Sequence, residues 1–306
     1  MISIIVTYYN TGWMIGRCLE SISMQTYDNY EVVLIDNGST DKSKMDVDDV
    51  MKNCKLKNCH YYYINHTSTN AAINYGLDLV QGEYVLIMDG YDFLNINTLH
   101  YYYWGMISGN ADMVIGDFEE VRYNTKMKDI TATPVDYNLL IIGPDKMIER
   151  MHTPTLHADL RYNHIWNKLY KTSLFDNYRL TDDMGCEITA IKDLVLKCDT
   201  IALASFVLYY RSMLQNVKLD LTISDAYKER IEYLKEHCGE TTVRNAQYLY
   251  LTNLVDIYKR NREPKLHAKC ADELVEAYES YHDFIPATSR ADLITRIYKN
   301  ILTKRL

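Results

Sequence analysis

Apolar and amphipathic stretches alternate along the first 95 residues of the chain. Uninterrupted apolar runs predict buried strands at 2–9, 30–36, 60–65 and 83–89. Residues 11–25 place Met14, Ile15, Cys18, Leu19 and Ile22 on one face of a helix; a second helix follows the polar turn at 37–43, and a third runs through 72–80. Strands that alternate with helices predict an α/β fold with a mostly parallel sheet flanked by helices.

Polar side chains follow several of these strands. In open parallel sheets, ligands bind beyond the carboxyl ends of the strands. The residues expected at that edge are Thr7 to Asn10, Asp36 to Ser39, Asn65 onward, and Asp89 to Asp92. The stretch GEYVLIMDGYDFLN is the most suggestive, because an apolar strand there delivers two carboxylates at its end.

The pattern becomes mixed after residue 95. We expect a helix at 97–108, a strand at 111–121 that is antiparallel or at the edge of the sheet, and a short helical segment at 161–175 that covers the site. Beyond about residue 220 the apolar spacing is helical throughout.

This change in pattern predicts two domains. The first is an α/β domain at 1–215, divided into a nucleotide-binding half at 1–94 and an acceptor half at 95–215. The second is a helical C-terminal subdomain at 216–306.

Composition narrows the class of protein. The formal net charge is −8, which argues against nucleic acid as a partner, because binding to phosphate backbones comes largely from Lys and Arg. The seven cysteines are an odd number, and the first residues, MISIIVTYYN, have no charged leader, so a reducing, cytoplasmic location is expected. Cys54, Cys59 and His60 have no second ligand pair at zinc spacing.

Three segments in order carry a family resemblance: ISIIVTYYNTGWMIGRCLESISMQTYDNYEVVLIDNGSTDKS, NHTSTNAAINYGLDLVQGEYVLIMDGYD and IWNKLYKTSLF. Together they resemble the family 2 glycosyltransferases with the GT-A type, Rossmann-like fold. The resemblance is strong over residues 1 to about 120, weaker from 161 to 211, and absent beyond roughly 220. It implies transfer of a sugar from a nucleotide-diphosphate donor, a UDP-sugar by expectation, to an acceptor hydroxyl with inversion at the anomeric carbon.

The resemblance also implies the donor-binding residues. The family's acidic pair after the second strand corresponds to Asp36 and Asn37. An amide both donates and accepts where a carboxylate only accepts, so the base preference is open between uracil and cytosine. Asp36 and Ser39 also suit a cap for the next helix. The donor-binding residues expected on this basis are Thr7, Tyr9, Asn10, Asp36, Asn37, Ser39, Asn65, Asp89 and Gly90.

The family's metal motif corresponds to Asp89, Gly90, Tyr91 and Asp92, with Tyr91 at the usual ligand position. A neutral phenol is a poor ligand for Mg²⁺ or Mn²⁺, which favour carboxylate, phosphate and water oxygens. Three alternatives stay open. Asp89 or Asp92 supplies the metal ligand from a shifted turn, the enzyme works without a divalent cation, or the site has lost activity.

Two further correspondences concern charge and catalysis. Ile73 stands where many relatives carry an Arg that faces the diphosphate, and Lys168 or Arg211 is a candidate replacement, against the alternative that each is an ordinary surface or packing residue. The resemblance places Glu187 at the catalytic base, with Asp183 as the fallback. A glutamate can take the proton of the acceptor hydroxyl as its oxygen attacks the anomeric carbon.

The acceptor is not determined by these motifs, and a glycan, a lipid-linked sugar or a protein is compatible with them. The second hypothesis for function is a degenerate relative that binds a nucleotide or a protein partner without turnover, motivated by Tyr91, Ile73 and Glu187. No apolar run approaches the ~18 residues of a membrane-spanning helix, so membrane contact would be peripheral. The basic amphipathic segment at 289–306 suits either an anionic membrane or its own protein.

Overall fold

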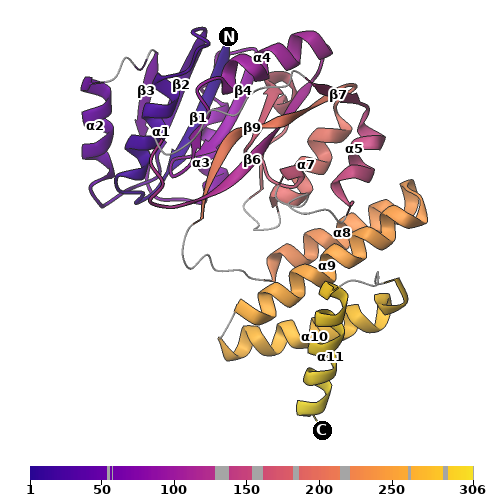
Figure 1. Cartoon of the computed structure of the whole chain (residues 1–306). Coiled ribbons are helices and arrows are strands. Elements are labelled where there is room, and N and C mark those ends of the chain that lie inside the picture. The colour runs from indigo at the N-terminus through magenta and orange to yellow at the C-terminus, as the bar shows by residue number, and fades with distance from the viewer. Residues whose placement is uncertain are drawn as a thin grey trace. The chain divides into compact units, whose positions relative to one another are not determined.

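The computed structural model describes residues 1–53, 56, 58–127, 138–153, 161–181, 186–213, 221–260, 263–284 and 289–305. The chain divides into two compact units (Figure 1). Unit 1 comprises Met1–Met147, Leu160–Asp182 and Ala190–Gln215, and unit 2 comprises Ile148–Asp159, Asp183–Thr189 and Asn216–Leu306. The two short internal segments therefore group with the C-terminal helices rather than with the sheet.

Unit 1 is built on one mixed sheet. Its strands are β1 (Ile2–Tyr8), β2 (Tyr30–Asp36), β3 (Cys59–Tyr63), β4 (Tyr84–Asp89), β5 (Phe93–Leu94), β6 (Met113–Arg122), β7 (Leu139–Ile142), β8 (Lys168–Lys171) and β9 (Ile201–Met213). The order across the sheet is β3-β2-β1-β4-β8-β6-β9-β5, and β7 pairs with β9. The pairs β2–β3, β1–β2 and β1–β4 are parallel, which confirms the sheet predicted from the alternating pattern.

Helices cover both faces of this sheet. The helices are α1 (Met14–Ser23), α2 (Ser43–Asn53), α3 (Thr69–Leu77), α4 (Thr98–Gly109), α5 (Pro144–Met151) and α7 (Cys186–Leu196), with a 3₁₀ turn, η2, at Thr172–Phe175. Alternate residues of β1, from Ile2 to Tyr8, share one buried cluster with α1, α2 and α4. The opposite face meets α3, where a Cβ on Gly76 would come within 2.7 Å of the Ile5 side chain.

In the second half of unit 1 one sequence prediction is confirmed and another is wrong. The segment at 111–121 forms β6, which is antiparallel to β8 as one of the two predicted alternatives, and it lies inside the sheet with β9 parallel on its other side. The segment at 161–175 is not simply helical, because its centre forms strand β8 between β4 and β6. Four residues, KLYK, are too few for periodicity to distinguish a strand from a helix.

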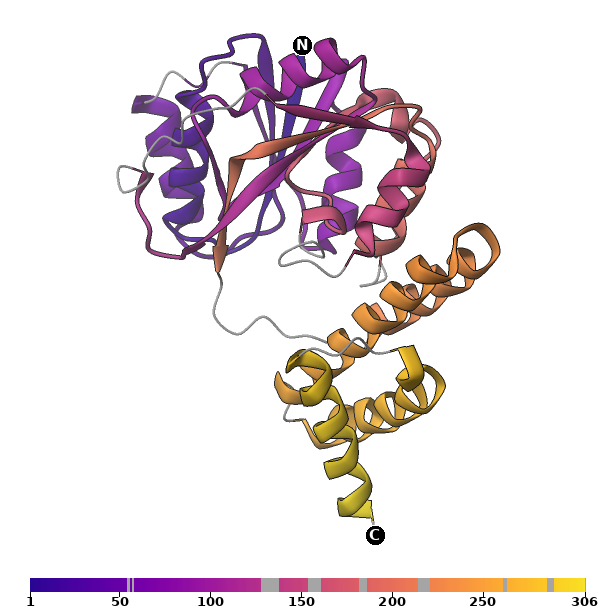
Figure 2. The ribbon, with the colours of Figure 1, turned by 45° about the vertical axis from the view of Figure 1, so that its right-hand side comes forward.

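The C-terminal region consists of helices, as predicted: α8 (Thr222–His237), α9 (Glu240–Arg260), α10 (Pro264–Tyr281), the 3₁₀ turn η3 (His282–Phe284) and α11 (Ser289–Arg305) (Figure 2). The apolar face of α11 is covered within this unit, since Ile294, Ile297 and Ile301 are buried and α11 packs on α9 and α10. Among the described residues, no helix has the length and apolar character needed to cross a membrane.

Candidate active site

Asp36 and Asp89 end two strands that flank β1 at one edge of the sheet. In the register of the sheet Tyr8 pairs with Asp36, and Thr7 pairs with Asp89. Neighbouring strands lie about 4.8 Å apart, so the two acidic residues are roughly 10 Å apart across β1. The sequence expected both at the carboxyl edge, and the structure places them there.

The carboxylate of Asp36 is buried and bound by three donors. The hydroxyl groups of Tyr8 and Tyr61 donate to its Oδ2 at 2.8 and 3.1 Å, and the backbone N–H of Ser39 donates to its Oδ1 at 2.8 Å. Burial and the neighbouring carboxylate raise the pKa of Tyr8 far above its ordinary value, and the same two causes raise the pKa of Tyr61 to about 12. Both phenols therefore stay protonated and act as donors to Asp36.

Asn37 is held by the loop that follows β3. Its Nδ2 donates to the carbonyl of Thr67 at 2.9 Å, and its Oδ1 accepts from the N–H of Thr67 at 2.9 Å. A carboxylate could accept the second of these bonds but could not make the first. This reciprocal pair gives a physical reason for the amide at a position where the family usually has an acid.

The same loop carries an exposed aromatic pair. His66 shares a hydrogen bond between its Nδ1 and the carbonyl of Asn37 at 3.0 Å. Its ring stacks on Tyr9, with centroids 4.0 Å apart, and both side chains are exposed. Asn65 is also exposed, one residue before His66. The expected donor residues Tyr9 and Asn65 therefore lie on the open side of this edge.

The loop after β1 is tied to the loop after β2. Asn10 has a left-handed backbone with φ of 50°, which asparagine tolerates better than most residues. Its Oδ1 accepts from the N–H of Thr40 at 2.8 Å, and its own N–H donates to the Ser39 hydroxyl at 3.0 Å. Thr7 is buried, and its carbonyl accepts from the N–H of Gly90 at 2.9 Å. These contacts fix the relative positions of three loops at the carboxyl edge.

The metal-motif segment forms a tight turn, because the N–H of Asp92 donates to the carbonyl of Asp89 at 3.0 Å. Glycine is required at position 90 because a side chain would not fit there, not because the backbone has a positive φ. A Cβ on Gly90 would lie 2.5 Å from the Cβ of Tyr8 and 2.9 Å from Ile15. The turn is thus pressed against the end of β1.

The two carboxyl groups of this turn differ in environment. Asp92 is buried, its Oδ2 accepts from the Tyr209 hydroxyl at 2.7 Å, and its Oδ1 accepts from the N–H of Ser212 at 2.7 Å. Burial, with the nearby charge of Asp89, raises the pKa of Asp92 to about 8. Asp89 is only partly buried. The sequence expected both as metal ligands, and Asp89 is the stronger candidate because it is partly exposed whereas Asp92 is buried.

Neither of the two cations considered for the diphosphate, Lys168 and Arg211, is unpaired, and the position of the family's Arg is apolar. Ile73 is buried in α3, so this position serves packing. Lys168 is fully buried, and its Nζ donates to the carbonyls of Arg161 and His164 at 2.8 and 2.6 Å. Arg211 pairs with Glu120 at 2.5 Å. These positions favour the alternative of an ordinary packing residue for Lys168 and of a partly exposed ion pair for Arg211.

The candidate base, Glu187, lies in the first turn of α7 and belongs to unit 2. It is partly buried. In the same unit, Arg230 of α8 is buried and donates to the carbonyl of Ile188, the residue after Glu187. The fallback candidate, Asp183, lies outside the described residues.

The sequence reasoning missed Arg17 of α1. This arginine is buried beneath the turn at 89–92, and its guanidinium donates to the carbonyl of Tyr91 at 2.6 Å and to the Ser212 hydroxyl at 2.7 Å. Burial lowers the pKa of Arg17, and the nearby charge of Asp92 opposes that shift. Nothing in the helical pattern of α1 identifies it, because its partners are 74 and 195 residues away in the chain.

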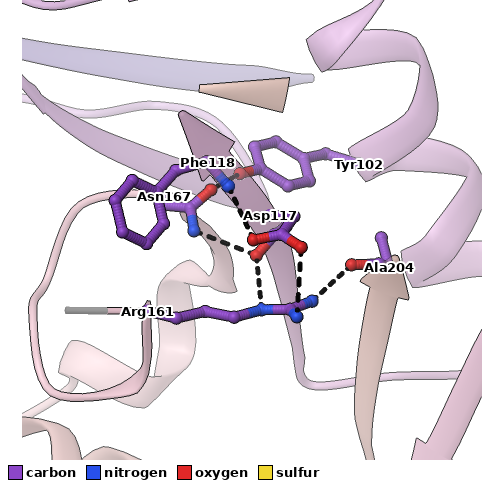
Figure 3. A network of polar contacts seen from close by, with 7 residues as sticks. Tyr102, Asp117, Phe118, Arg161, Asn167 and Ala204 are labelled. Atoms are coloured by element: carbon purple, nitrogen blue, oxygen red, sulfur yellow. Dashed lines mark hydrogen bonds and ion pairs between the residues drawn. The ribbon is translucent and has the colours of Figure 1, made fainter. Parts of the chain in front are cut away.

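A second missed cluster lies where β6 becomes irregular (Figure 3). Arg161 donates to the carbonyls of Gly116 and Ala204 at 3.1 and 2.5 Å and pairs with Asp117 at 3.4 Å. Asn167, with φ of 63°, donates to the same Gly116 carbonyl and accepts from Tyr102. These contacts join β6, β9 and the segment before β8. The polar atoms satisfy backbone groups that the bulge in β6 would otherwise leave unpaired.

Comparison of the sequence and the structure with known proteins shows which family and which fold this chain shares. The family profile described as "Glycosyl transferase family 2" matches residues 3–178. Glycosyltransferase GlyG of Streptococcus pneumoniae serotype 4 is 35% identical over 152 residues, which are 49% of this chain and 47% of GlyG. The chain thus spans about half the length of that relative.

Solved structures share the architecture. The S. aureus TarS 1–349 structure in complex with UDP-GlcNAc superposes with a TM-score of 0.69 at 16% identity, covering 99% of this chain and 91% of that one. The mannosyltransferase PcManGT from Pyrobaculum calidifontis, in complex with GDP-Man and Mn²⁺, gives a TM-score of 0.57 at 13% identity, covering 100% and 88%. At these identities the likeness concerns the fold, which confirms the expected GT-A type architecture.

Proposed function

Because the chain belongs to glycosyl transferase family 2, we propose that it transfers a sugar from a nucleotide-diphosphate sugar to an acceptor hydroxyl with inversion at the anomeric carbon. A UDP-sugar is the proposed donor, supported by the UDP-GlcNAc bound to the structurally similar TarS. The observation that carries the proposal is the placement of Asp36 and Asp89 on either side of β1 at the carboxyl edge of a parallel sheet.

On the donor side, we assign the nucleoside to the edge formed by β1, β2 and the loop after β3. The buried carboxylate of Asp36 accepts from Tyr8, Tyr61 and Ser39, which leaves one of its roughly four acceptor sites for a ribose hydroxyl or a base N–H. The exposed stack of Tyr9 on His66 offers a flat apolar face for a base. Asn37 contributes indirectly, since its amide holds the loop at Thr67.

The carboxyl edge of the sheet offers few protein ligands for a divalent cation. Among the described residues there is no group of three or more His, Cys, Asp or Glu side chains able to enclose a metal ion. Mg²⁺ in nucleotide enzymes is commonly held by one or two carboxylates together with substrate phosphates. Asp89 is the residue proposed to hold such a cation with the donor. When bound, the cation offsets the negative charge of the leaving diphosphate.

The proposed base is Glu187. Its carboxylate takes the proton of the acceptor hydroxyl while the acceptor oxygen bonds to the anomeric carbon, and the bond from that carbon to the nucleoside diphosphate breaks. The diphosphate leaves on the opposite side, so the configuration inverts. A glycan, a lipid-linked sugar or a protein is compatible as the source of the hydroxyl.

Calorimetric titration with UDP, GDP and CDP, each with and without Mn²⁺, tests the donor assignment. We expect UDP to bind and its affinity to rise when Mn²⁺ is present. If the protein binds GDP or CDP but not UDP, the assignment of uracil as the nucleobase of the donor is wrong. Binding of UDP that is indifferent to Mn²⁺ would remove Asp89 from the metal role and leave a metal-free transferase.

A second function is favoured by two observations: the turn at 89–92 carries Tyr91 where relatives have a ligand, and position 73 is a buried isoleucine. A protein with this site could bind a nucleotide or a partner without transfer. The same titration, followed by measurement of UDP-sugar hydrolysis, separates the two functions. Nucleotide binding with no turnover on any UDP-sugar or acceptor supports the second.

A further inference from the structure

We propose that Arg17 and Ser212 are positioning residues that hold the turn at 89–92 in the geometry needed to bind the donor. This inference rests on the proposed function, because it assigns Asp89 of that turn to the donor and its cation. It concerns residues on α1 and β9, outside the motif itself. The helical pattern of α1 and the strand pattern of β9 did not indicate such a role.

The first observation is how the carbonyl of Tyr91 is held. It accepts from Arg17 at 2.6 Å and from the hydroxyl of Ser212 at 2.6 Å, so both of its lone pairs are used. Arg17 also donates to Ser212 at 2.7 Å. These three groups form a closed triangle behind the turn.

The second observation is that Arg17 is itself fixed by several elements. Its other guanidinium nitrogen donates to the carbonyls of Thr125 and Tyr123 at 2.7 and 3.2 Å. The guanidinium lies 4.4 Å from the ring centroid of Phe93 and 5.2 Å from that of Trp13. The planar fork of arginine donates to these carbonyl and hydroxyl oxygens and lies against aromatic rings at the same time, which a lysine ammonium does not do. The side chain therefore cannot move without breaking contacts to several segments.

The third observation is that Ser212 forms two hydrogen bonds to the turn. Its hydroxyl donates to the carbonyl of Tyr91, and its backbone N–H donates to Oδ1 of the Asp92 carboxyl group at 2.7 Å. On the other side of the turn, the carbonyl of Thr7 accepts from Gly90 at 2.9 Å. The backbone of the turn is thus fixed from both sides, and Asp89, at its start, is only partly buried. A rigid turn keeps this carboxylate in place before the donor arrives, which lowers the entropic cost of binding.

Three single variants test the inference. Ser212→Ala removes one donor to Tyr91 and keeps the backbone bond to Asp92. Arg17→Lys keeps the positive charge but lacks the fork. Ser3→Ala is the matched control, because Ser3 is also a buried strand serine with two hydrogen bonds, to Glu31 and Gly82, at the opposite end of β1.

We expect Ser212→Ala and Arg17→Lys to weaken UDP binding in the presence of Mn²⁺ by about tenfold or more, because small displacements of binding groups have large effects. Ser3→Ala should bind UDP as the wild type does, even if its melting temperature falls as far. In transfer assays the loss should appear in the KM for the donor more than in kcat. Amide exchange at Gly90 and Asp92 should accelerate by about tenfold in Arg17→Lys without nucleotide.

The outcomes separate this inference from the proposed function. Wild-type affinity for UDP and unchanged exchange at Gly90 and Asp92 in both variants would overturn the positioning role while leaving the function intact. An equal loss of affinity in Ser3→Ala would show that general destabilisation explains the effect. Failure of the wild-type protein itself to bind any nucleotide would reject the proposed function first.

Discussion

Asn37→Asp restores the residue that relatives usually carry, and we expect it to destabilise this protein. Asn37 is 4% exposed, and its Nδ2 donates to the Thr67 carbonyl at 2.9 Å. A carboxylate would place an acceptor against that carbonyl. The lost bond and the unsatisfied acceptor cost about 1–3 kcal/mol. The new charge would also lie next to the carboxyl of Asp36, and two unit charges about 6 Å apart repel by roughly 2.8 kcal/mol at an effective dielectric constant of about 20.

The expected loss in free energy of unfolding at pH 7 is therefore about 4–6 kcal/mol, measured by urea denaturation. Asn74→Asp is the matched control, because Asn74 forms the same reciprocal pair with Leu180, donating at 2.8 Å and accepting at 2.9 Å, but is only partly buried. It should lose about 1–2 kcal/mol, the cost of the hydrogen bond alone.

The effect should depend on pH. A protonated carboxyl can donate to the Thr67 carbonyl, and burial raises the folded-state pKa of the introduced acid above its unfolded value. A raised acid pKa means that stability is lost as pH rises, so the deficit of Asn37→Asp should be largest above the folded-state pKa and shrink toward pH 4. Unfolding of Asn37→Asp at the wild-type urea midpoint at pH 7, or at the midpoint of Asn74→Asp, would refute this reasoning.

Four other outcomes are expected. Gly90→Ala should lose about 1–3 kcal/mol because its Cβ would meet Tyr8, whereas Gly143→Ala, with no atom within 4 Å, should unfold like the wild type; equal midpoints for the two would contradict the steric argument. Burial raises the pKa of Asp92 to about 8, so its ionisation lowers the stability of the folded state as pH rises from about 4 to 8. The melting temperature of Asp92→Asn should therefore fall less over this pH range than that of the wild type. Melting temperatures that fall in parallel would contradict this prediction. Asp89→Asn should abolish the gain in UDP affinity on adding Mn²⁺, and an unchanged gain would locate the cation elsewhere. Glu187→Gln should reduce transfer by about 10²–10⁴-fold with UDP binding unchanged, and wild-type turnover would remove Glu187 from the base role.

The sequence alone determined the architecture of the first 95 residues and of the C-terminal region. Buried parallel strands are uninterrupted apolar runs and surface helices are periodic, so both are visible locally. The positions of Asp36 and Asp89 follow, because carboxyl ends of parallel strands share an edge. The C-terminal helices were predicted for the same reason, since each shows an apolar stripe at helical spacing.

Only the tertiary structure decided which polar residues are engaged and with whom. Strand β8 was missed because four residues have no usable period, and its place between β4 and β6 depends on antiparallel pairing with distant segments. Asp92 and Lys168 look like site residues in the sequence, yet both are buried and bound by the protein. A sequence pattern reports whether a position is apolar, but it does not report the partner of a buried charge.

Arg17 and Asn37 illustrate the same limit from the other direction. Arg17 lies among apolar positions of α1, and its role comes from the carbonyl of Tyr91 and the hydroxyl of Ser212, which only folding brings to it. Asn37 has an amide nitrogen where the family usually has a carboxylate oxygen. This nitrogen donates to the carbonyl of Thr67, 30 residues along the chain, which a carboxylate could not do. Periodicity is a local property of the chain, whereas a hydrogen bond between distant residues exists only after the fold has formed.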